Sequence, residues 1–303
     1  MSSAHVAIRT VALAGASGLL GRRVLDALLD DGSFDVIVFA RSGSKPDYPA
    51  RAKIVTVDYE SPESLEAALH GVDAVVSTLG KKTGLECQFK LIDAAVASGV
   101  KRFLPSEFGA DLKSPKIRAF PTYRTKVQIE DYLETLAMET NLTYTYIYNS
   151  LLFDYGLALG VFGDFAARTV NLYDGGETPF SATTISTVAR AVVATLHNFE
   201  QTKNRAVRVS DLSTTPRELL GTLQKLDSAR QWVPISVDTG NLVREAEHEL
   251  ASGKFSLKAF GAFATRATFA PGFAASYNSD NELLSIVEMT QEELEEMLKT
   301  RMS

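Results

Sequence analysis

A glycine-rich turn near the start of the chain most constrains what it can fold into. The turn reads Gly15-Ala16-Ser17-Gly18-Leu19-Leu20-Gly21 and lies between a β-branched run, Thr10 to Ala14, and an amphipathic stretch, Leu19 to Asp30. A strand, a glycine turn and a helix in this order can hold the pyrophosphate of a dinucleotide at the start of the helix. The first glycine permits the tight turn, the second lets phosphate approach the backbone, and the third lets helix and strand pack closely. All seven residues are therefore predicted to bind a dinucleotide, the alternative being a plain strand-to-helix turn.

The first half of the chain continues this alternation of strand and helix. Such a pattern is typical of parallel strands joined by helical crossovers. Further helices are predicted from Pro62 behind the N-cap Ser61, near Leu85 to Ser98, and over Tyr123 to Thr140. The predicted class is α/β, a Rossmann fold with a parallel sheet. Its further strands are expected at Val36 to Ala40, Lys53 to Val57, Ala74 to Ser77, Lys101 to Leu104 and Thr143 to Tyr148.

The pattern is less regular beyond Asn149. Ile185 to Leu196 predicts a helix and Ala206 to Val209 a strand, whereas Phe255 to Tyr277 is rich in aromatic residues, glycine and alanine without clean periodicity. We expect a Rossmann domain over residues 1–156. A smaller substrate-binding lobe, interleaved with that domain, is expected over residues 157–303.

Composition excludes several classes of protein. Hydrophobic residues make up 45% of the 303 positions and charged ones 22%, which is ordinary for a globular chain. Cys87 is the single cysteine and the four histidines show no ligand spacing, so we expect neither a disulfide nor a metal site. The net charge of -6 argues against nucleic acid as a partner. No membrane segment is recognised, and we expect a cytoplasmic monomer or homodimer with a small-molecule substrate.

The end of the second predicted strand indicates which dinucleotide binds. A carboxylate at this place accepts a hydrogen bond from the ribose 2′-hydroxyl of NAD and would repel a 2′-phosphate. Here the strand ends in Arg41 and Ser42, with Lys45 close behind. A guanidinium can bind a 2′-phosphate through two hydrogen bonds and stack on adenine. These three residues therefore favour NADP(H), the alternative being an arginine in an exposed loop.

Several further segments together resemble a known family. They are Ser77-Thr78-Leu79-Gly80, Gln88 with the following helix, and Leu104-Pro105-Ser106-Glu107-Phe108-Gly109. With the glycine turn they resemble the NmrA-like group of atypical short-chain dehydrogenases, and within it the isoflavone reductase and phenylcoumaran benzylic ether reductase branch. The resemblance covers about residues 8 to 156. It implies an NADPH-dependent oxidoreductase that acts on a small aromatic or polycyclic secondary metabolite.

The resemblance also suggests site residues. Asn149 matches an asparagine near the nicotinamide, although asparagine at a strand end is also a common turn residue. We expect Thr78, Leu79, Gly80 and Gln88 at the cofactor as well, Gln88 alternatively lying on a helix surface. Phe108 and Phe153 are candidates for an apolar substrate wall, and either would also suit the core.

Lys126 is the candidate catalytic residue. It is followed by Ile129-Glu130, which matches the pattern of the family's single lysine on the helix after the Pro-Ser-Glu-Phe-Gly segment. A lysine beside the cofactor on an apolar helix face could exchange a proton with a substrate oxygen while hydride moves. The alternative is a surface lysine paired with Glu130 one turn on. Thr122 stands where ordinary short-chain dehydrogenases have tyrosine, so their alcohol-oxidising pair is absent.

Two other functions remain open at this point. NmrA-like proteins include dinucleotide sensors that bind a transcription regulator and catalyse nothing, but a sensor needs no proton donor such as Lys126. A redox-neutral isomerase or cyclase that uses bound NADP is also compatible with the fold, because chemistry depends on the site and not on the sheet.

Overall fold

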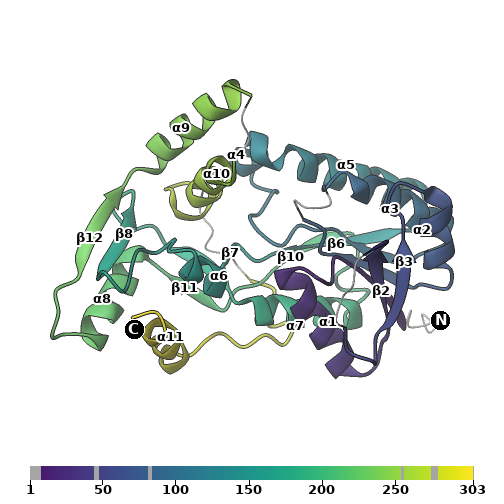
Figure 1. The fold of residues 1–303 in the computed structure, drawn as a ribbon, viewed down its shortest axis with the longest axis horizontal. Coiled ribbons are helices and arrows are strands. Elements are labelled where there is room, and N and C mark those ends of the chain that lie inside the picture. Colours follow the sequence, from purple (N-terminus) through teal and green to yellow (C-terminus); the bar gives the residue numbers. More distant parts are fainter. Residues whose placement is uncertain (1–7, 44–47, 81–83, 254–255, 274–278, 303) are drawn as a thin grey trace.

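A seven-stranded parallel sheet forms one lobe of the computed structural model, which describes residues 8–43, 48–80, 84–253, 256–273 and 279–302 (Figure 1). The strand order is β10-β6-β5-β4-β1-β2-β3. From β1 the chain builds the sheet outward through β2 and β3, and then returns to add β4 on the other side of β1. The strand order therefore reverses between β1 and β4. In open parallel sheets, ligands bind at such a reversal, outside the carboxyl ends of the strands. The strands are β1 (Thr10–Ala14), β2 (Asp35–Arg41), β3 (Lys53–Val57), β4 (Ala74–Ser77), β5 (Arg102–Leu104), β6 (Thr143–Tyr148) and β10 (Arg205–Arg208).

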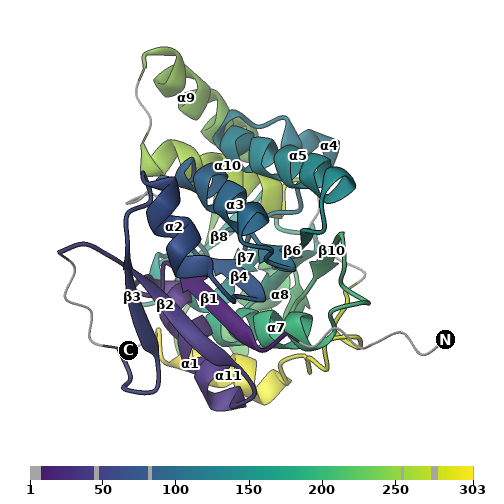
Figure 2. The ribbon, with the colours of Figure 1, turned by 90° about the vertical axis from the view of Figure 1, so that its right-hand side faces the viewer.

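Helices cover both faces of this sheet (Figure 2). One face packs against α2 (Pro62–Leu69), α3 (Cys87–Ala97) and α5 (Arg124–Glu139), and the other against α1 (Leu19–Asp31) and α7 (Ile185–His197). Side chains alternate between the faces, so in β1 Ala12 and Ala14 join the first layer while Val11 and Leu13 join the second. Both faces are therefore buried, as a parallel sheet requires.

The predicted elements of the first half are confirmed, with shifts of one or two residues at their ends. Ser61 caps α2 by accepting a hydrogen bond from the Ser64 backbone N–H at 3.1 Å. Gly99 takes a φ of 73° just after α3, which ends that helix in the left-handed region. The helix α3 begins at Cys87 and not at Leu85, because Leu85 lies in a turn that accepts from the Gln88 N–H.

The other lobe is built from short strands and helices around an aromatic core. Its strands form two small sheets, β11-β9-β7 and β12-β8. Phe153, Phe162, Phe180 and Phe269 lie at the centre of the lobe. Its elements are β7 (Leu151–Leu152), α6 (Phe153–Ala158), β8 (Thr169–Tyr173), β9 (Phe180–Thr183), β11 (Leu212–Thr214), α8 (Pro216–Leu226), β12 (Val233–Val237), α9 (Thr239–Ala251), α10 (Leu257–Phe269) and α11 (Gln291–Lys299).

Two connections tie the lobes together. The helix α7 and the strand β10 come from the second half of the chain but belong to the Rossmann lobe, where β10 pairs with β6. The irregular-looking segment after Phe255 contains α10, whose Phe263 packs against Phe120 with ring centres 5.1 Å apart. Phe120 precedes the single turn η1 (Pro121–Tyr123) and follows α4 (Pro115–Arg118). The domain boundary at residue 156 stays a prediction.

Among the helices that the structure describes, none combines the length and the hydropathy needed to cross a bilayer.

The turn between β1 and α1 packs tightly against the end of β4. Gly15 has a φ of 88°, and a Cβ there would lie 2.7 Å from the carbonyl carbon of Thr78. A Cβ on Gly21 would lie 2.2 Å from the carbonyl oxygen of Gly15. The Thr78 backbone N–H and hydroxyl both donate to the Ala14 carbonyl, at 2.8 and 2.9 Å. The glycines are therefore required by backbone contacts within the protein itself.

We predict that Gly21→Ala destabilises the protein by about 1–3 kcal/mol, the usual cost of forcing an extra methyl group into a packed site. Chemical denaturation followed by circular dichroism measures the change. Gly221→Ala is the matched control, because its Cβ meets nothing within 4 Å in the middle of α8. The control should be neutral or stabilise by up to about 1 kcal/mol. Equal effects of the two substitutions would contradict the packing described for the turn.

Candidate active site

The start of α1 provides a cradle for an anion. Gly18 is the N-cap and makes no side-chain capping bond, and the first turn carries no acidic residue. The first backbone N–H groups of a helix have no partner within the helix, and the helix dipole favours negative charge there. A Cβ on Gly18 would meet only the Gly15 carbonyl oxygen, at 3.3 Å, so the approach from outside is open. Ser17 and Leu19 are exposed beside it, while Ala16 is buried and Leu20 partly buried.

Arg41 and Ser42 lie exposed at the carboxyl end of β2, the neighbour of β1. Burial raises the pKa of Tyr59, which follows β3, and the nearby positive charge of Arg41 opposes that rise. Arg41 therefore lies at the same edge of the sheet as the glycine turn. Lys45, the third residue predicted to hold a 2′-phosphate, lies outside the described residues.

The segment after β4 continues this edge. Thr78 holds the glycine turn as described, Leu79 is buried, and Gly80 is exposed with open space around it. Gln88 is buried, and its Oε1 accepts a hydrogen bond from the Ser106 backbone N–H at 2.9 Å. It is thus neither on a helix surface nor without a partner, and it joins α3 to the loop after β5.

Lys126 and Glu107 meet at the next step along the edge. The Nζ of Lys126 donates to the backbone carbonyl oxygen of Glu107 and lies 3.9 Å from the Oε2 of its carboxyl group. The side chain of Lys126 is 16% exposed and that of Glu107 only 2%. Lys126 therefore points back to the loop after β5 and not out to solvent.

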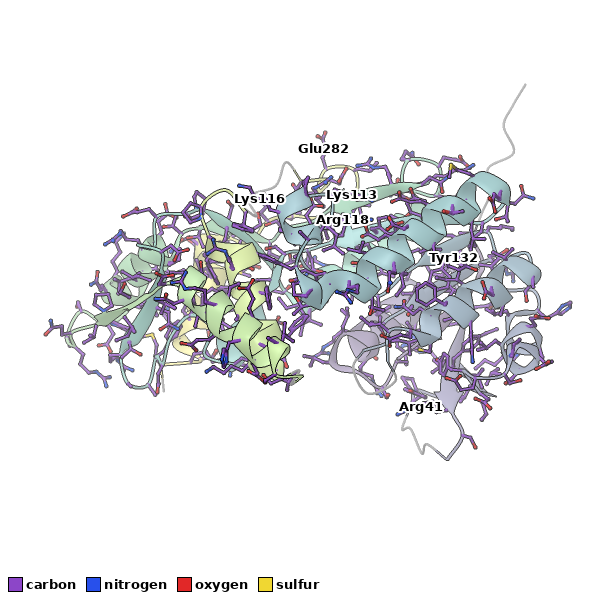
Figure 3. All side chains as sticks on the ribbon, turned by 90° about the horizontal axis from the view of Figure 1, so that it is seen from above. Arg41, Lys113, Lys116, Arg118, Tyr132 and Glu282 are labelled. Atoms are coloured by element: carbon purple, nitrogen blue, oxygen red, sulfur yellow. The ribbon has the colours of Figure 1, made fainter. Side chains whose placement is uncertain are left out.

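Glu130 has a different set of partners. Its carboxylate pairs with Arg118 at 2.8 Å and Lys113 at 3.4 Å, and it accepts from the Tyr148 hydroxyl. Figure 3 shows Lys113 and Arg118 close together beside α5, far from Arg41. The pairing of Lys126 with Glu130, considered as an alternative from the sequence, is not the arrangement found.

The carboxyl group of Glu107 is poorly satisfied. Its Oε2 is buried without a hydrogen-bond partner among the described residues. Burial raises the pKa of Glu107 to about 7, the charge of Glu130 adds to the rise, and the charges of Lys126, Lys113 and Arg118 oppose it. The group therefore titrates near neutral pH, which is unusual for a carboxyl group.

Asn149 lies at the end of β6 and is fully buried. Its amide nitrogen donates to the Ser150 carbonyl at 3.2 Å, while its Oδ1 has no partner among the described residues. Its own backbone N–H and that of Ser150 donate to the Gly109 carbonyl, which fixes the strand end to the loop containing Glu107. A buried acceptor without a partner costs free energy, so a ligand N–H would be favoured there.

The two phenylalanines proposed for the substrate differ in position. Phe108 is half-buried beside Glu107 and has a φ of 32°. Phe153 is fully buried in the aromatic core of the second lobe, with its ring centre 5.3 Å from that of Phe162. The core role suits the burial of Phe153, and Phe108, in the loop after β5, is itself partly buried against the core on the α1 and α7 side of the sheet.

An aromatic contact brings α10 of the second lobe to the start of α5. Tyr123, buried before Lys126, meets Phe260 edge to face with ring centres 6.1 Å apart. Within the described ranges there is no group of three or more histidine, cysteine or acidic side chains that could hold a metal ion.

Comparison with known proteins defines the class. Oxidoreductase aprR of Aspergillus flavus is 30% identical over 284 residues, which cover 91% of this chain and 94% of the relative. A structure titled AtPrR2 with NADP+ and (+)pinoresinol superposes with a TM-score of 0.80 at 24% identity, covering 97% of this chain and 99% of the other. A leucoanthocyanidin reductase from Vitis vinifera in complex with NADPH gives 0.71 at 22% identity, with the same coverage.

The fold and the relatives define an oxidoreductase of the Rossmann class, as the sequence predicts. The NmrA-like family model matches residues 8–228, so the chain belongs to the NmrA-like family. The cofactors named for the two structural neighbours, NADP+ and NADPH, agree with the one expected from the sequence.

The sequence does not single out Glu107, although it stands inside the segment Leu104 to Gly109 that carries the family resemblance. Its contact with Lys126 spans 19 positions and depends on how α5 lies against the loop after β5. No local pattern predicts such a contact.

We predict that the stability of the protein falls more steeply with rising pH than that of Glu107→Gln. The pKa of Glu107 lies near 4.5 in the unfolded chain and about 7 in the folded one. Between these two pH values the folded protein therefore binds more protons than the unfolded chain. Stability is then lost as pH rises from about 4.5 to 7, by about 2–3 kcal/mol. Denaturant midpoints at pH 5 and pH 8 measure it, and parallel curves for the two proteins would contradict the burial of an ionisable group at this position.

Proposed function

We propose that the protein is an NADPH-dependent reductase of a small aromatic or polycyclic metabolite, with Lys126 as proton donor or acceptor. The observation that carries the proposal is the joint position of the glycine cradle and Lys126. The cradle follows the carboxyl end of β1 and Lys126, on α5, contacts the loop that follows the carboxyl end of β5, on the other side of the point where the strand order reverses. In sheets of this kind that edge holds a dinucleotide.

The residues present suit NADP(H). The turn Gly15 to Gly21 would hold the pyrophosphate with its backbone N–H groups, while Arg41, Ser42 and Lys45 would hold the 2′-phosphate. Thr78, Leu79 and Gly80 would line the path between the two ends of the cofactor. The unsatisfied Oδ1 of Asn149 would accept from a carboxamide at the nicotinamide end, and Gln88 would act by fixing the loop after β5.

The protein's own contribution to the reaction is at Lys126. NADPH, when bound, supplies a hydride. The Nζ of Lys126 would deliver a proton to the atom of the substrate that gains negative charge, or take one in the reverse direction. Phe108, beside Glu107 in the loop after β5, offers an apolar contact for a flat ring, and we keep Phe153 as a second candidate.

We predict that NADPH binds more tightly than NADH and that Arg41→Ala removes the difference. A hydrogen bond to a charged group contributes about 1.5–3 kcal/mol, so the affinity for NADPH should fall roughly 10- to 100-fold while that for NADH stays the same. Fluorescence titration of both nucleotides measures this. Arg51→Ala is the control, since Arg51 binds Asp30 and the Leu29 carbonyl near the end of α1. Equal affinity of the unchanged protein for the two nucleotides would show that Arg41 does not select NADP(H).

We expect Lys126→Ala to lower kcat by about 10²- to 10⁴-fold, the usual contribution of a positioned acid or base, without loss of NADPH binding. The assay follows NADPH oxidation on a panel that starts with (+)-pinoresinol, the ligand named for one structural neighbour. Lys101→Ala is the control, because Lys101 pairs with Asp73 at the opposite edge of the sheet. Full turnover by Lys126→Ala would exclude the acid or base role. Conversion of substrate without net NADPH oxidation would identify a redox-neutral enzyme instead.

A further inference from the structure

Two groups of Glu107 face the ammonium of Lys126. The backbone carbonyl oxygen accepts its hydrogen bond, and the Oε2 lies 3.9 Å from the Nζ. The carbonyl fixes where the Nζ lies, and the carboxyl group sets the charge that it experiences. One residue of the loop after β5 thus determines both position and electrostatics.

The carboxyl groups of Glu130 and Glu107 differ in how well their oxygens are satisfied. Glu130 is fully buried and bonded to Arg118, Lys113 and the Tyr148 hydroxyl, so it has the partners that a buried carboxylate requires. Glu107 is almost as deeply buried, yet its Oε2 makes no hydrogen bond within the described residues. A buried oxygen without a partner is costly, and among the residues that the structure places, the cation paired with it is Lys126.

We propose that Glu107 is a positioning residue: its backbone carbonyl holds the Lys126 ammonium in place, and its carboxylate favours the charged, proton-donating form of that group. The inference rests on the proposed role of Lys126 in proton transfer. An opposite charge within about 4–6 Å favours the charged form of a group by about 1–3 pH units. The carboxylate supplies that charge from inside the protein, where solvent screens it little.

The proton balance follows from the exposure of the two side chains. In the forward reaction the substrate would gain a hydride from NADPH and a proton from the Nζ of Lys126, which would be left as a neutral amine. The side chain of Lys126 is 16% exposed and can regain a proton from water, whereas that of Glu107 is only 2% exposed. In this proposal Glu107 contributes its charge, and the proton that reaches the substrate comes from Lys126.

Other charges around Glu107 modify this coupling but do not replace it. Burial raises the pKa of Glu107 to about 7, so its carboxyl group is ionised in the alkaline range. The tyrosines nearby have raised pKa values and stay neutral there. Within the described part of the chain, the groups that interact electrostatically with Glu107 include Lys126 and Glu130 on α5, Arg118 on α4, Lys113 before it, Tyr123 on η1, and Tyr146 and Tyr148 on β6.

The test is the titration of Lys126 in the whole protein, measured by its labelling with trace acetic anhydride against pH and read by peptide mass spectrometry. We expect Glu107→Gln to move the labelling midpoint of Lys126 to lower pH by about 1–3 units. Glu107→Asp keeps the negative charge, so the labelling midpoint of Lys126 in this variant should lie between those of the unchanged protein and of Glu107→Gln. Lys258, whose side chain is 79% exposed, is the internal control and should not move. Glu134→Gln is the matched variant, since it removes a carboxylate from α5 that binds Lys113 instead.

The proposal is overturned if folded Glu107→Gln leaves the Lys126 midpoint unchanged, or if Glu134→Gln moves it as far. If Glu107→Gln does not fold, the reciprocal measurement replaces it. Lys126→Met should move the midpoint of the glutamate that titrates near pH 7 upward, followed by ¹³C NMR of glutamate-labelled protein, and no movement would again overturn the proposal. Labelling needs no substrate, so a shifted midpoint combined with full turnover by Lys126→Ala would refute the proposed function and leave the coupling intact.

Discussion

The close packing of the β1–α1 turn against the end of β4 is the constraint on which the site depends. No side chain fits at Gly15 or Gly21, because Thr78 and the Gly15 carbonyl occupy the space that a Cβ would need. This contact fixes the start of α1 at the point where the strand order reverses. The exposed N–H groups of the helix and the residues after β2 and β4 are thereby brought to one edge of the sheet.

At the loop after β5, on the same edge of the sheet, the site depends on buried charged side chains. Glu130 pairs with Arg118 and Lys113, which also pair with Asp131 and Glu134, so Glu107 in the loop after β5 and Lys126 form a separate pair. The second lobe reaches this place through Phe260 and Phe263 of α10, which contact Tyr123 and Phe120. The proposed chemistry therefore lies where the two lobes meet, and the substrate would be selected by residues from both.

Much of the Rossmann lobe could be predicted from the sequence because its signals are local. The continuous apolar run of β1, the cap at Ser61 and the left-handed Gly99 each depend on neighbouring residues. The residues after the strands could be placed at one edge from topology alone, as for Arg41 and Thr78.

The rest depends on contacts between distant parts of the chain. Arg102 is fully buried and binds the Thr143 and Thr145 hydroxyls and the Phe199 carbonyl, which ties the end of α7 to β5 and β6. Nothing local marks an arginine as part of the core, since arginine is rarely buried. The same holds for Glu107 and Lys126, and for α10, whose alanines and phenylalanines lack a clean helical period because both lobes cover them.

The most direct test of the account is a crystal structure of the protein with NADP+. The account predicts the pyrophosphate at the N–H groups beside Gly18, the 2′-phosphate at Arg41, and the nicotinamide C4 facing the space in front of the Lys126 Nζ. A substrate atom placed against C4 would then lie within hydrogen-bond distance of the Nζ, about 3 Å, either directly or through one water. A nicotinamide bound elsewhere, with protein side chains between C4 and Lys126, would contradict it.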